Sequence, residues 1–274
     1  MRLPTGRTTQ ILNCLPDGSP LVYFEYSYDP AGRMTKVLRE DRNVVYYGYD
    51  SGSRLTSEDW YDAGMNPLYS FQWDYDAVGN RTYQRRGDVE TYYEYDEANE
   101  LLRSRELPAD AWTYYQYDPC GSCTAIQEPD GTTYFAYNDL KLVTSIAYKT
   151  GVANYFYYDA QMRRYAIEES TGLRYFTWDR NGMNLLCERE PDGSVAAEYA
   201  HGYTPTDGIG SMVAARKVEG GATYYQYPIY DHRGSVMRLV DESGTVTATY
   251  EYRCLCQVVS GVGRGDLLSL RSRS

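Results

Sequence analysis

The sequence predicts an all-β protein in which consecutive antiparallel β-hairpins, one for each repeat of about 21 residues, form one twisted, spiralling sheet. Three observations predict this fold. An aromatic residue recurs at a nearly constant interval, aromatic and polar residues alternate just before it, and turn residues follow it. A fixed period of about 20 to 50 residues is typical of repeat proteins, whose units pack mainly against their neighbours.

The recurring aromatic residue belongs to a pair that reads Tyr-Asp in most repeats, and we call it the repeat marker. Eight of the ten intervals between consecutive markers are 20 to 22 residues long, and the intervals of 26 and 31 residues indicate loop insertions. The markers are Tyr28, Tyr49, Tyr75, Tyr95, Tyr117, Tyr137, Tyr158, Trp178, Tyr199, Tyr230 and Tyr252.

The residues before each marker alternate with a period of two, which is the pattern of a β-strand. Of 274 residues 32 are Tyr and only 5 are Phe. Tyrosine suits a half-buried strand because its ring packs while its hydroxyl finds a partner. The aromatic pairs that share one face, which we expect to point inward, are Trp73 with Tyr75, Tyr93 with Tyr95, Tyr115 with Tyr117 and Phe176 with Trp178.

Turn residues follow each marker. In Asp29-Pro30-Ala31-Gly32 the Asp carboxylate can accept a nearby backbone N–H, Pro presets its own φ, and Gly permits a positive φ. Similar turns begin at Asp50 and Asp76, and a second set, such as Pro129-Asp130-Gly131 and Pro191-Asp192-Gly193, precedes the next strand. Two turns per period predict two short strands per period.

We assign a structural role to the recurring residues of the marker and its turn, and no catalytic, cofactor-binding or metal-binding role to any residue. This repeat signature comprises Tyr28, Asp29, Gly32, Tyr49, Asp50, Tyr75, Asp76, Gly79, Asn80, Arg81, Tyr95, Asp96, Tyr117, Asp118, Tyr158, Asp159, Trp178, Asp179, Tyr230, Asp231 and Gly234.

These phrases resemble the YD-repeat, or Rhs-repeat, family. Residues 7–37, RTTQILNCLPDGSPLVYFEYSYDPAGRMTKV, resemble a complete repeat unit of that family, and residues 230–252, YDHRGSVMRLVDESGTVTATYEY, resemble the end of its core region. The resemblance implies a sheet that spirals into a hollow shell. Such shells enclose a toxic C-terminal domain in bacterial Rhs and insecticidal toxin-complex proteins, a related array occurs in the animal teneurins, and the setting is extracellular or at the cell surface.

The resemblance predicts a lead-in at residues 1–6, a repeat array at 7–253 that ends in the core-like segment 230–252, and a weakly ordered tail at 254–274. The family's Tyr-Asp-Pro-Phe-Gly phrase is replaced after Tyr250 by Arg253-Cys254-Leu255-Cys256, and residues 257–274 contain no aromatic residue. We therefore expect a truncated core fragment that lacks the segment in which the family's aspartyl self-cleavage occurs.

Composition argues against several partners. The net charge of −11 disfavours nucleic acid and anionic membranes, because both attract positively charged proteins. No uncharged stretch approaches the roughly 20 residues of a membrane helix, and no signal peptide is recognisable, so we expect no membrane insertion.

The cysteines offer one candidate site. Cys120-Gly121-Ser122-Cys123 could be a redox pair, or half of a zinc site completed by Cys254 and Cys256. However, Cys120 takes the turn position that Ala31 holds in another repeat, and this alignment favours a structural reading.

Asp231 and Asp241 could form a carboxylate pair for proteolysis, but each precedes a predicted turn. His201 and His232 are the only histidines and have no nucleophilic motif beside them. We predict that the chain is not an enzyme.

We therefore expect a structural segment of an Rhs-type shell that encapsulates or presents a toxin or effector polypeptide. Its partners would be other parts of the same shell or the enclosed effector, and exposed sheet edges would favour self-association. An extracellular glycan-binding or adhesion module is the main alternative, since exposed rings beside polar groups can stack on sugars. A decayed, non-functional fragment is a further one.

Overall fold

The computed structural model describes residues 6–14, 18–180, 184–202, 211–253 and 257–263. These residues form strands and turns, and no helix among them could cross a membrane. The predicted all-β class is confirmed. The strands are β1 (Gln10–Cys14), β2 (Pro20–Tyr28), β3 (Met34–Arg39), β4 (Val44–Tyr49), β5 (Leu55–Tyr61), β6 (Pro67–Tyr75), β7 (Arg81–Arg86), β8 (Val89–Tyr95), β9 (Leu101–Leu107), β10 (Ala111–Tyr117), β11 (Cys123–Glu128), β12 (Gly131–Tyr137), β13 (Val143–Ala147), β14 (Ala153–Tyr158), β15 (Arg164–Glu169), β16 (Gly172–Trp178), β17 (Leu185–Arg189), β18 (Val195–His201), β19 (Met212–Glu219), β20 (Ala222–Tyr230), β21 (Val236–Val240), β22 (Val246–Arg253) and β23 (Gln257–Gly263).

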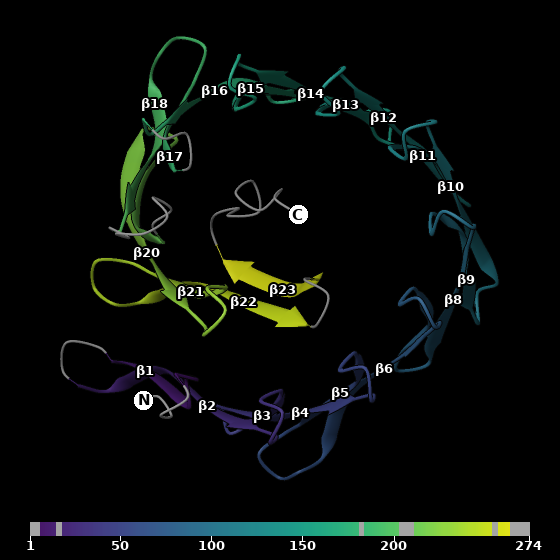
Figure 1. Cartoon of the computed structure of the whole chain (residues 1–274). Helices are drawn as coiled ribbons and strands as arrows, with labels where there is room; N and C mark the ends of the chain where they lie inside the picture. Colours follow the sequence, from purple (N-terminus) through teal and green to yellow (C-terminus); the bar gives the residue numbers. More distant parts are fainter. Residues whose placement is uncertain (1–5, 15–17, 181–183, 203–210, 254–256, 264–274) are drawn as a thin grey trace. The chain divides into compact units, whose positions relative to one another are not determined.

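Strands that follow one another in the chain pair antiparallel from β2 to β15 and from β16 to β23. Their order can be followed by label and colour in Figure 1. Each repeat supplies two strands, as β7 and β8 do between the markers Tyr75 and Tyr95. The predicted string of hairpins is therefore confirmed.

A β-bulge precedes the repeat markers. The register shifts between Ser27 and Tyr28, and again at the same place in later repeats, for example between Glu94 and Tyr95 and between Gln116 and Tyr117. A bulge bends its strand and increases the local right-handed twist. The twist predicted for the sheet therefore has a local cause that recurs with the sequence period.

The structure corrects one marker. In β18 the bulge falls between Ala200 and His201. The backbone N–H of Gly202 donates to the carbonyl of Ser211 across the turn, just as the residue after the marker donates across the turn in other repeats, for example Asp29 to Arg33. His201, rather than the predicted Tyr199, therefore occupies the marker position. Tyr199 is a buried core residue two positions earlier.

The chain divides into two compact units: a central unit, Phe24–Leu173, and a flanking unit made of Met1–Tyr23 and Arg174–Ser274. The central unit buries aromatic pairs from single strand faces, such as Phe24 with Tyr26 and Phe71 with Trp73, whose ring centroids lie 6.1 and 5.9 Å apart. From β8 to β14 the inward rings are half-buried and the alternate positions of β8, β10, β12 and β14 are exposed.

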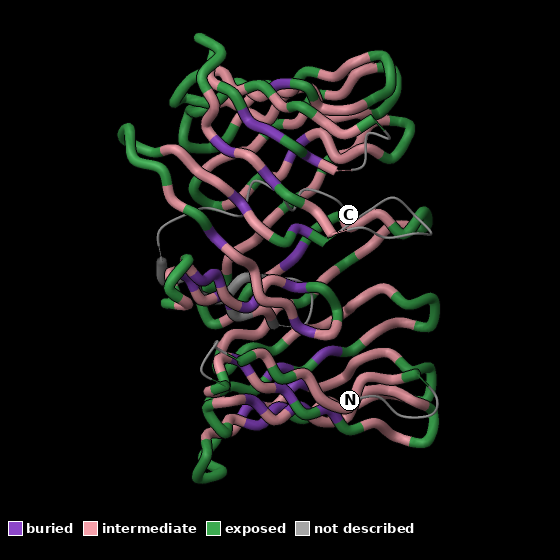
Figure 2. The backbone as a smooth tube through the Cα atoms, turned by 90° about the vertical axis from the view of Figure 1, so that its left-hand side faces the viewer, coloured by how far each residue is buried: buried purple, intermediate pink, exposed green. Residues whose placement is uncertain are grey.

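The flanking unit has its own core. Its buried members are Leu185, Ala197, Tyr199, Met212, Ala215, Leu239, Ala248 and Tyr250. Phe176 and Trp178 pack against this cluster, so the predicted inward direction of that pair holds. Figure 2 shows buried residues along the strands and exposed residues concentrated at the turns.

The sequence predicts a weakly ordered tail from residue 254 onward. Residues Gln257–Gly263 of this tail form β23, which pairs with β22, and the order of the tail stays a prediction. Cys254, Cys256 and residues 264–274 lie outside the described residues.

Candidate functional site

Seven marker tyrosines each connect their repeat to the one before it. Their hydroxyls donate to the backbone carbonyl of the first residue of a strand in the preceding repeat, at oxygen–oxygen distances of 2.6 to 3.1 Å. The pairs are Tyr49 to Met34, Tyr75 to Leu55, Tyr95 to Arg81, Tyr117 to Leu101, Tyr137 to Cys123, Tyr158 to Val143 and Tyr230 to Met212. His201 makes the equivalent contact, with its Nε2 2.7 Å from the carbonyl of Leu185.

The position of the acceptor follows from the register. Met34 lies opposite the marker Tyr28, Leu55 lies opposite Tyr49, and the same relation recurs along the chain. Each hydroxyl therefore reaches the backbone beside the previous marker, and we call this repeated contact the tyrosine lock. Burial raises the pKa of Tyr158, so its phenol stays protonated and able to donate at neutral pH.

The signature aspartates shape the turns. Asp Oδ1 accepts the backbone N–H of the residue four positions on, at 2.8 to 3.0 Å, in the turns that begin at Asp29, Asp50, Asp76, Asp96, Asp118, Asp159 and Asp231. In the longer turn after Trp178, the side-chain amide of Asn184 donates to Asp179 Oδ2 at 2.7 Å. Hydrogen bonds from the backbone and side chain of Arg54 lower the pKa of Asp50.

Signature glycines occupy left-handed positions in these turns, with φ of +85° at Gly32, +105° at Gly79 and +75° at Gly234. The turn after Tyr49 differs, because Ser53 rather than Gly52 has the positive φ, of 65°. Glycine is favoured at such a position because it has no Cβ to clash, but the turn does not require it in every repeat.

Arginines add a second connection between repeats. The Arg54 guanidinium holds Asp50 at 2.6 Å, donates to the carbonyl of Asp76 at 2.6 Å and lies 5.0 Å above the Tyr75 ring. Arg33 makes the corresponding contacts with the next repeat.

Two other signature residues also reach the next repeat. Arg81 lies 4.5 Å from the centre of the Tyr93 ring, and Asn80 Nδ2 donates to Asn99 Oδ1 at 2.8 Å. The signature residues with contacts described here thus take part in turns, cores or contacts between repeats.

The structure separates Asp231 from Asp241, and Cys120 and Cys123 form no disulfide with each other. Asp231 and Asp241 serve separate turns at opposite ends of β21, about 17 Å apart for five extended residues. Cys123 Sγ lies 3.6 Å from the carbonyl of Ala125, and Cys120 is exposed at its turn. Among the described residues no group of three or more His, Cys, Asp and Glu could hold a metal ion.

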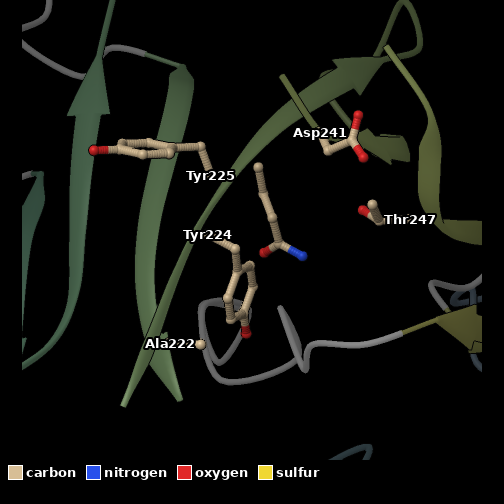
Figure 3. Close-up of a pocket in the computed structure, with 6 residues that line it drawn as sticks. Ala222, Tyr224, Tyr225, Asp241 and Thr247 are labelled. Carbon is tan, nitrogen blue, oxygen red and sulfur yellow. The ribbon is translucent and has the colours of Figure 1, made fainter. Parts of the chain in front are cut away.

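A groove in the flanking unit was not predicted. It consists of two neighbouring pockets that share Tyr224, and we call it the Tyr224 groove. The larger, apolar pocket has a volume of about 440 Å³ and is lined by Ala222, Tyr224, Tyr225, Gln226, Asp241 and Thr247. Figure 3 shows Tyr224 on one side of it and Asp241 and Thr247 on the other.

The smaller, charged pocket has a volume of about 210 Å³ and contains Glu188, Glu190, Glu219, Arg174 and Lys217 among its lining residues. Glu188 is only 4% exposed; its Oε1 accepts the Tyr199 hydroxyl at 2.6 Å and its Oε2 lies 3.2 Å from Arg174. Burial, together with the charge of Glu188, raises the pKa of Tyr199, so this hydroxyl remains a donor.

The fold and the repeated contacts define a β-hairpin repeat protein. No protein-family model matches the sequence, and none of the curated proteins matches it. Solved structures similar to the chain include TcdB2-TccC3 without its hypervariable C-terminal region, with 12% identity, a TM-score of 0.46, and coverage of 96% of this chain and 20% of that one.

Two further structures have similar values. TcdB2-TccC3 gives 12% identity, a TM-score of 0.46 and coverage of 96% and 21%, and a Tc holotoxin pore of Photorhabdus luminescens gives 14%, 0.42, 93% and 17%. The chain thus spans about a fifth of the length of the chains it resembles.

Proposed function

We propose that this chain is a non-enzymatic structural segment of an Rhs-type shell, whose sheet encapsulates or presents a toxin or effector polypeptide. The tyrosine lock is the observation that carries this proposal. The tyrosine hydroxyls, which recur most regularly in the sequence, hold one repeat against the next. A continuous wall requires such contacts between neighbouring repeats.

The energies are consistent with a structural role for these contacts. One intramolecular hydrogen bond contributes about 1 kcal/mol net, so the seven tyrosine locks together contribute on the order of 7 kcal/mol. That is comparable with the total stability of about 5 to 15 kcal/mol of an ordinary domain. The seven locked tyrosines are therefore accounted for by the cohesion of the array without a ligand.

A protection experiment tests the wall function. An unfolded Gly-Ser-rich passenger, with one site for a sequence-specific protease that cuts nowhere else, is fused to the carboxyl end of the full chain. We expect cleavage at least about tenfold slower than for the same passenger on an unrelated monomeric carrier, because a covered segment must first become exposed. Equal cleavage rates on both carriers would contradict encapsulation by this chain.

Glycan binding is the second candidate, and a row of exposed tyrosines favours it. Tyr92, Tyr114, Tyr134 and Tyr155 are 42 to 58% exposed and occupy equivalent positions on alternate strands of the central unit. Alternate strands lie about 10 Å apart, too far for these rings to stack on one another. A glycan array with the Tyr114→Ala variant tests it: lost binding at an unchanged melting temperature would support a sugar site.

A further inference from the structure

We infer that the Tyr224 groove binds an extended polypeptide segment in which an apolar side chain is followed, two residues later, by Lys or Arg. This inference rests on the proposed function, since it names the chemistry of the polypeptide that the shell segment would hold. The geometry, charge and polarity of the groove support it in turn.

Several lining residues of both pockets share one face of the sheet, whereas Tyr225, which follows Tyr224 on β20, has the opposite face. Ala197 lies directly opposite Lys217, and Lys217 directly opposite Tyr224, so these three residues share a face. Gln226 lies two residues after Tyr224 on β20 and therefore has the same face. The charged and the apolar pocket thus form one surface across β18, β19 and β20.

Tyr224 links the two pockets chemically. Its ring lines the apolar pocket, and its hydroxyl donates to Glu219 Oε2 in the charged pocket at 3.1 Å. An apolar side chain can pack against the ring while a cationic group reaches Glu219. Residues i and i+2 of an extended segment lie on one side about 7 Å apart, so a single segment can direct two side chains toward pockets that share Tyr224.

Charge favours a basic partner. The charged pocket contains three carboxylates, Glu188, Glu190 and Glu219, against the two cationic groups of Arg174 and Lys217. Arg174 is 42% exposed and bridges Glu188 and Glu190 at 3.2 and 3.3 Å. The more exposed Glu190 and Glu219 remain within reach of an incoming cation, and the chain's net charge of −11 adds long-range attraction.

The apolar pocket suits a hydrophobic side chain better than a purely ionic ligand. The Thr247 hydroxyl donates to the carbonyl of Leu239, and Asp241 Oδ1 accepts the backbone N–H groups of Ser243 and Thr245. The hydrogen-bonding capacity of both side chains is thus largely committed within the protein. A hydrophobic side chain beside the Tyr224 ring suits this pocket better than a sugar or an inorganic ion does.

The test uses a defined peptide, acetyl-Gly-Ser-Phe-Thr-Arg-Ser-Gly-amide, added to the full isotope-labelled chain while backbone amide shifts are recorded. We expect saturable shifts in β19, β20 and the β17–β18 hairpin, with a dissociation constant on the order of 0.1 to 1 mM. Peptides with Gly for Phe, or Glu for Arg, should bind at least about tenfold more weakly, since each lacks one of the two contacts.

Protein variants locate the site. The double variant Glu190→Gln and Glu219→Gln should weaken binding about three- to tenfold, because exposed ion pairs contribute modestly. Tyr224→Phe tests the hydroxyl and keeps the ring. Glu97→Gln, which removes one exposed carboxylate in a turn of the central unit, should leave binding unchanged.

The inference would be overturned if the amide shifts were confined to other strands, or if the Glu-containing peptide bound with equal affinity. Displacement of the Phe-Thr-Arg peptide from the groove by a neutral oligosaccharide would also overturn it. The outcome is separable from the wall function. A protected passenger without peptide binding rejects the groove alone, and peptide binding without passenger protection rejects the wall alone.

Discussion

The tyrosine lock predicts a specific loss of stability when one hydroxyl is removed. In Tyr158→Phe the ring stays, but the 2.9 Å hydrogen bond to the Val143 carbonyl in the preceding repeat is lost. One hydrogen bond contributes about 1 kcal/mol net to stability. If water can replace the lost donor at the Val143 carbonyl, the loss of stability stays near that value; a buried carbonyl without any donor would cost roughly 3 kcal/mol. Tyr158 is only partly buried, so we expect about 1 kcal/mol.

Tyr155→Phe is the matched control. Tyr155 lies three residues earlier on β14, on the opposite face, and is 47% exposed. Removal of its hydroxyl should change stability by less than about 0.5 kcal/mol, the usual range for surface substitutions. The two variants remove the same atom from the same strand and differ mainly in the lock.

Hydrogen exchange measures the difference locally. Amides of β13 and β14 should exchange about fivefold faster in Tyr158→Phe than in Tyr155→Phe, which corresponds to about 1 kcal/mol. Amides of β6 and β7, several repeats away, serve as the internal reference. Equal exchange in the two variants, or a larger effect from Tyr155→Phe, would refute the structural role of the hydroxyl.

Three further predictions follow from the same contacts. Arg54→Lys keeps the charge but loses the planar contacts to Asp50, Asp76 and Tyr75, so urea denaturation should show a loss of about 1 kcal/mol, against less than about 0.5 kcal/mol for the exposed Arg86→Lys. Hydrogen bonds from Arg163 lower the pKa of Asp159 in the folded protein. The ionised Asp159 therefore stabilises the folded state above its unfolded-state pKa of about 3.9, and this stabilisation is lost as the pH falls through the lower folded-state pKa. The melting temperature should drop below about pH 4, and it should drop less steeply in Asp159→Asn. The chain should keep its full mass for days between about pH 4 and 8, since Asp231 and Asp241 serve separate turns, and a fragment that disappears in Asp231→Asn would revive that residue as a catalytic group.

The fold could be predicted from the sequence because its signals are local and repeated. The alternation of aromatic and polar residues before Tyr95 and the turn residues that begin at Asp29 depend only on neighbours in the chain. Both patterns can therefore be recognised without the tertiary structure. In β18 the marker position could not be predicted from the aromatic residues alone. The sequence pattern selects the aromatic Tyr199, which lies two residues before His201. His201 nevertheless occupies the marker position, because its imidazole nitrogen lies as close to a main-chain carbonyl as a tyrosine hydroxyl does in other repeats.

The Tyr224 groove could not be predicted, because its lining comes from residues 174–247 on several strands. Nothing beside Glu188 in the sequence indicates that it is buried; its burial depends on Tyr199 and Arg174 from neighbouring strands.

Hydrogen exchange along the whole unmodified chain is the most direct test of the repeated, interlocked sheet. We predict two protected strands in every repeat, separated by unprotected turns after the markers, with a period of 20 to 22 residues in most of the chain between Tyr28 and Tyr252. Protection without this period, or a block of several consecutive repeats without any protection, would contradict a continuous array of locked hairpins.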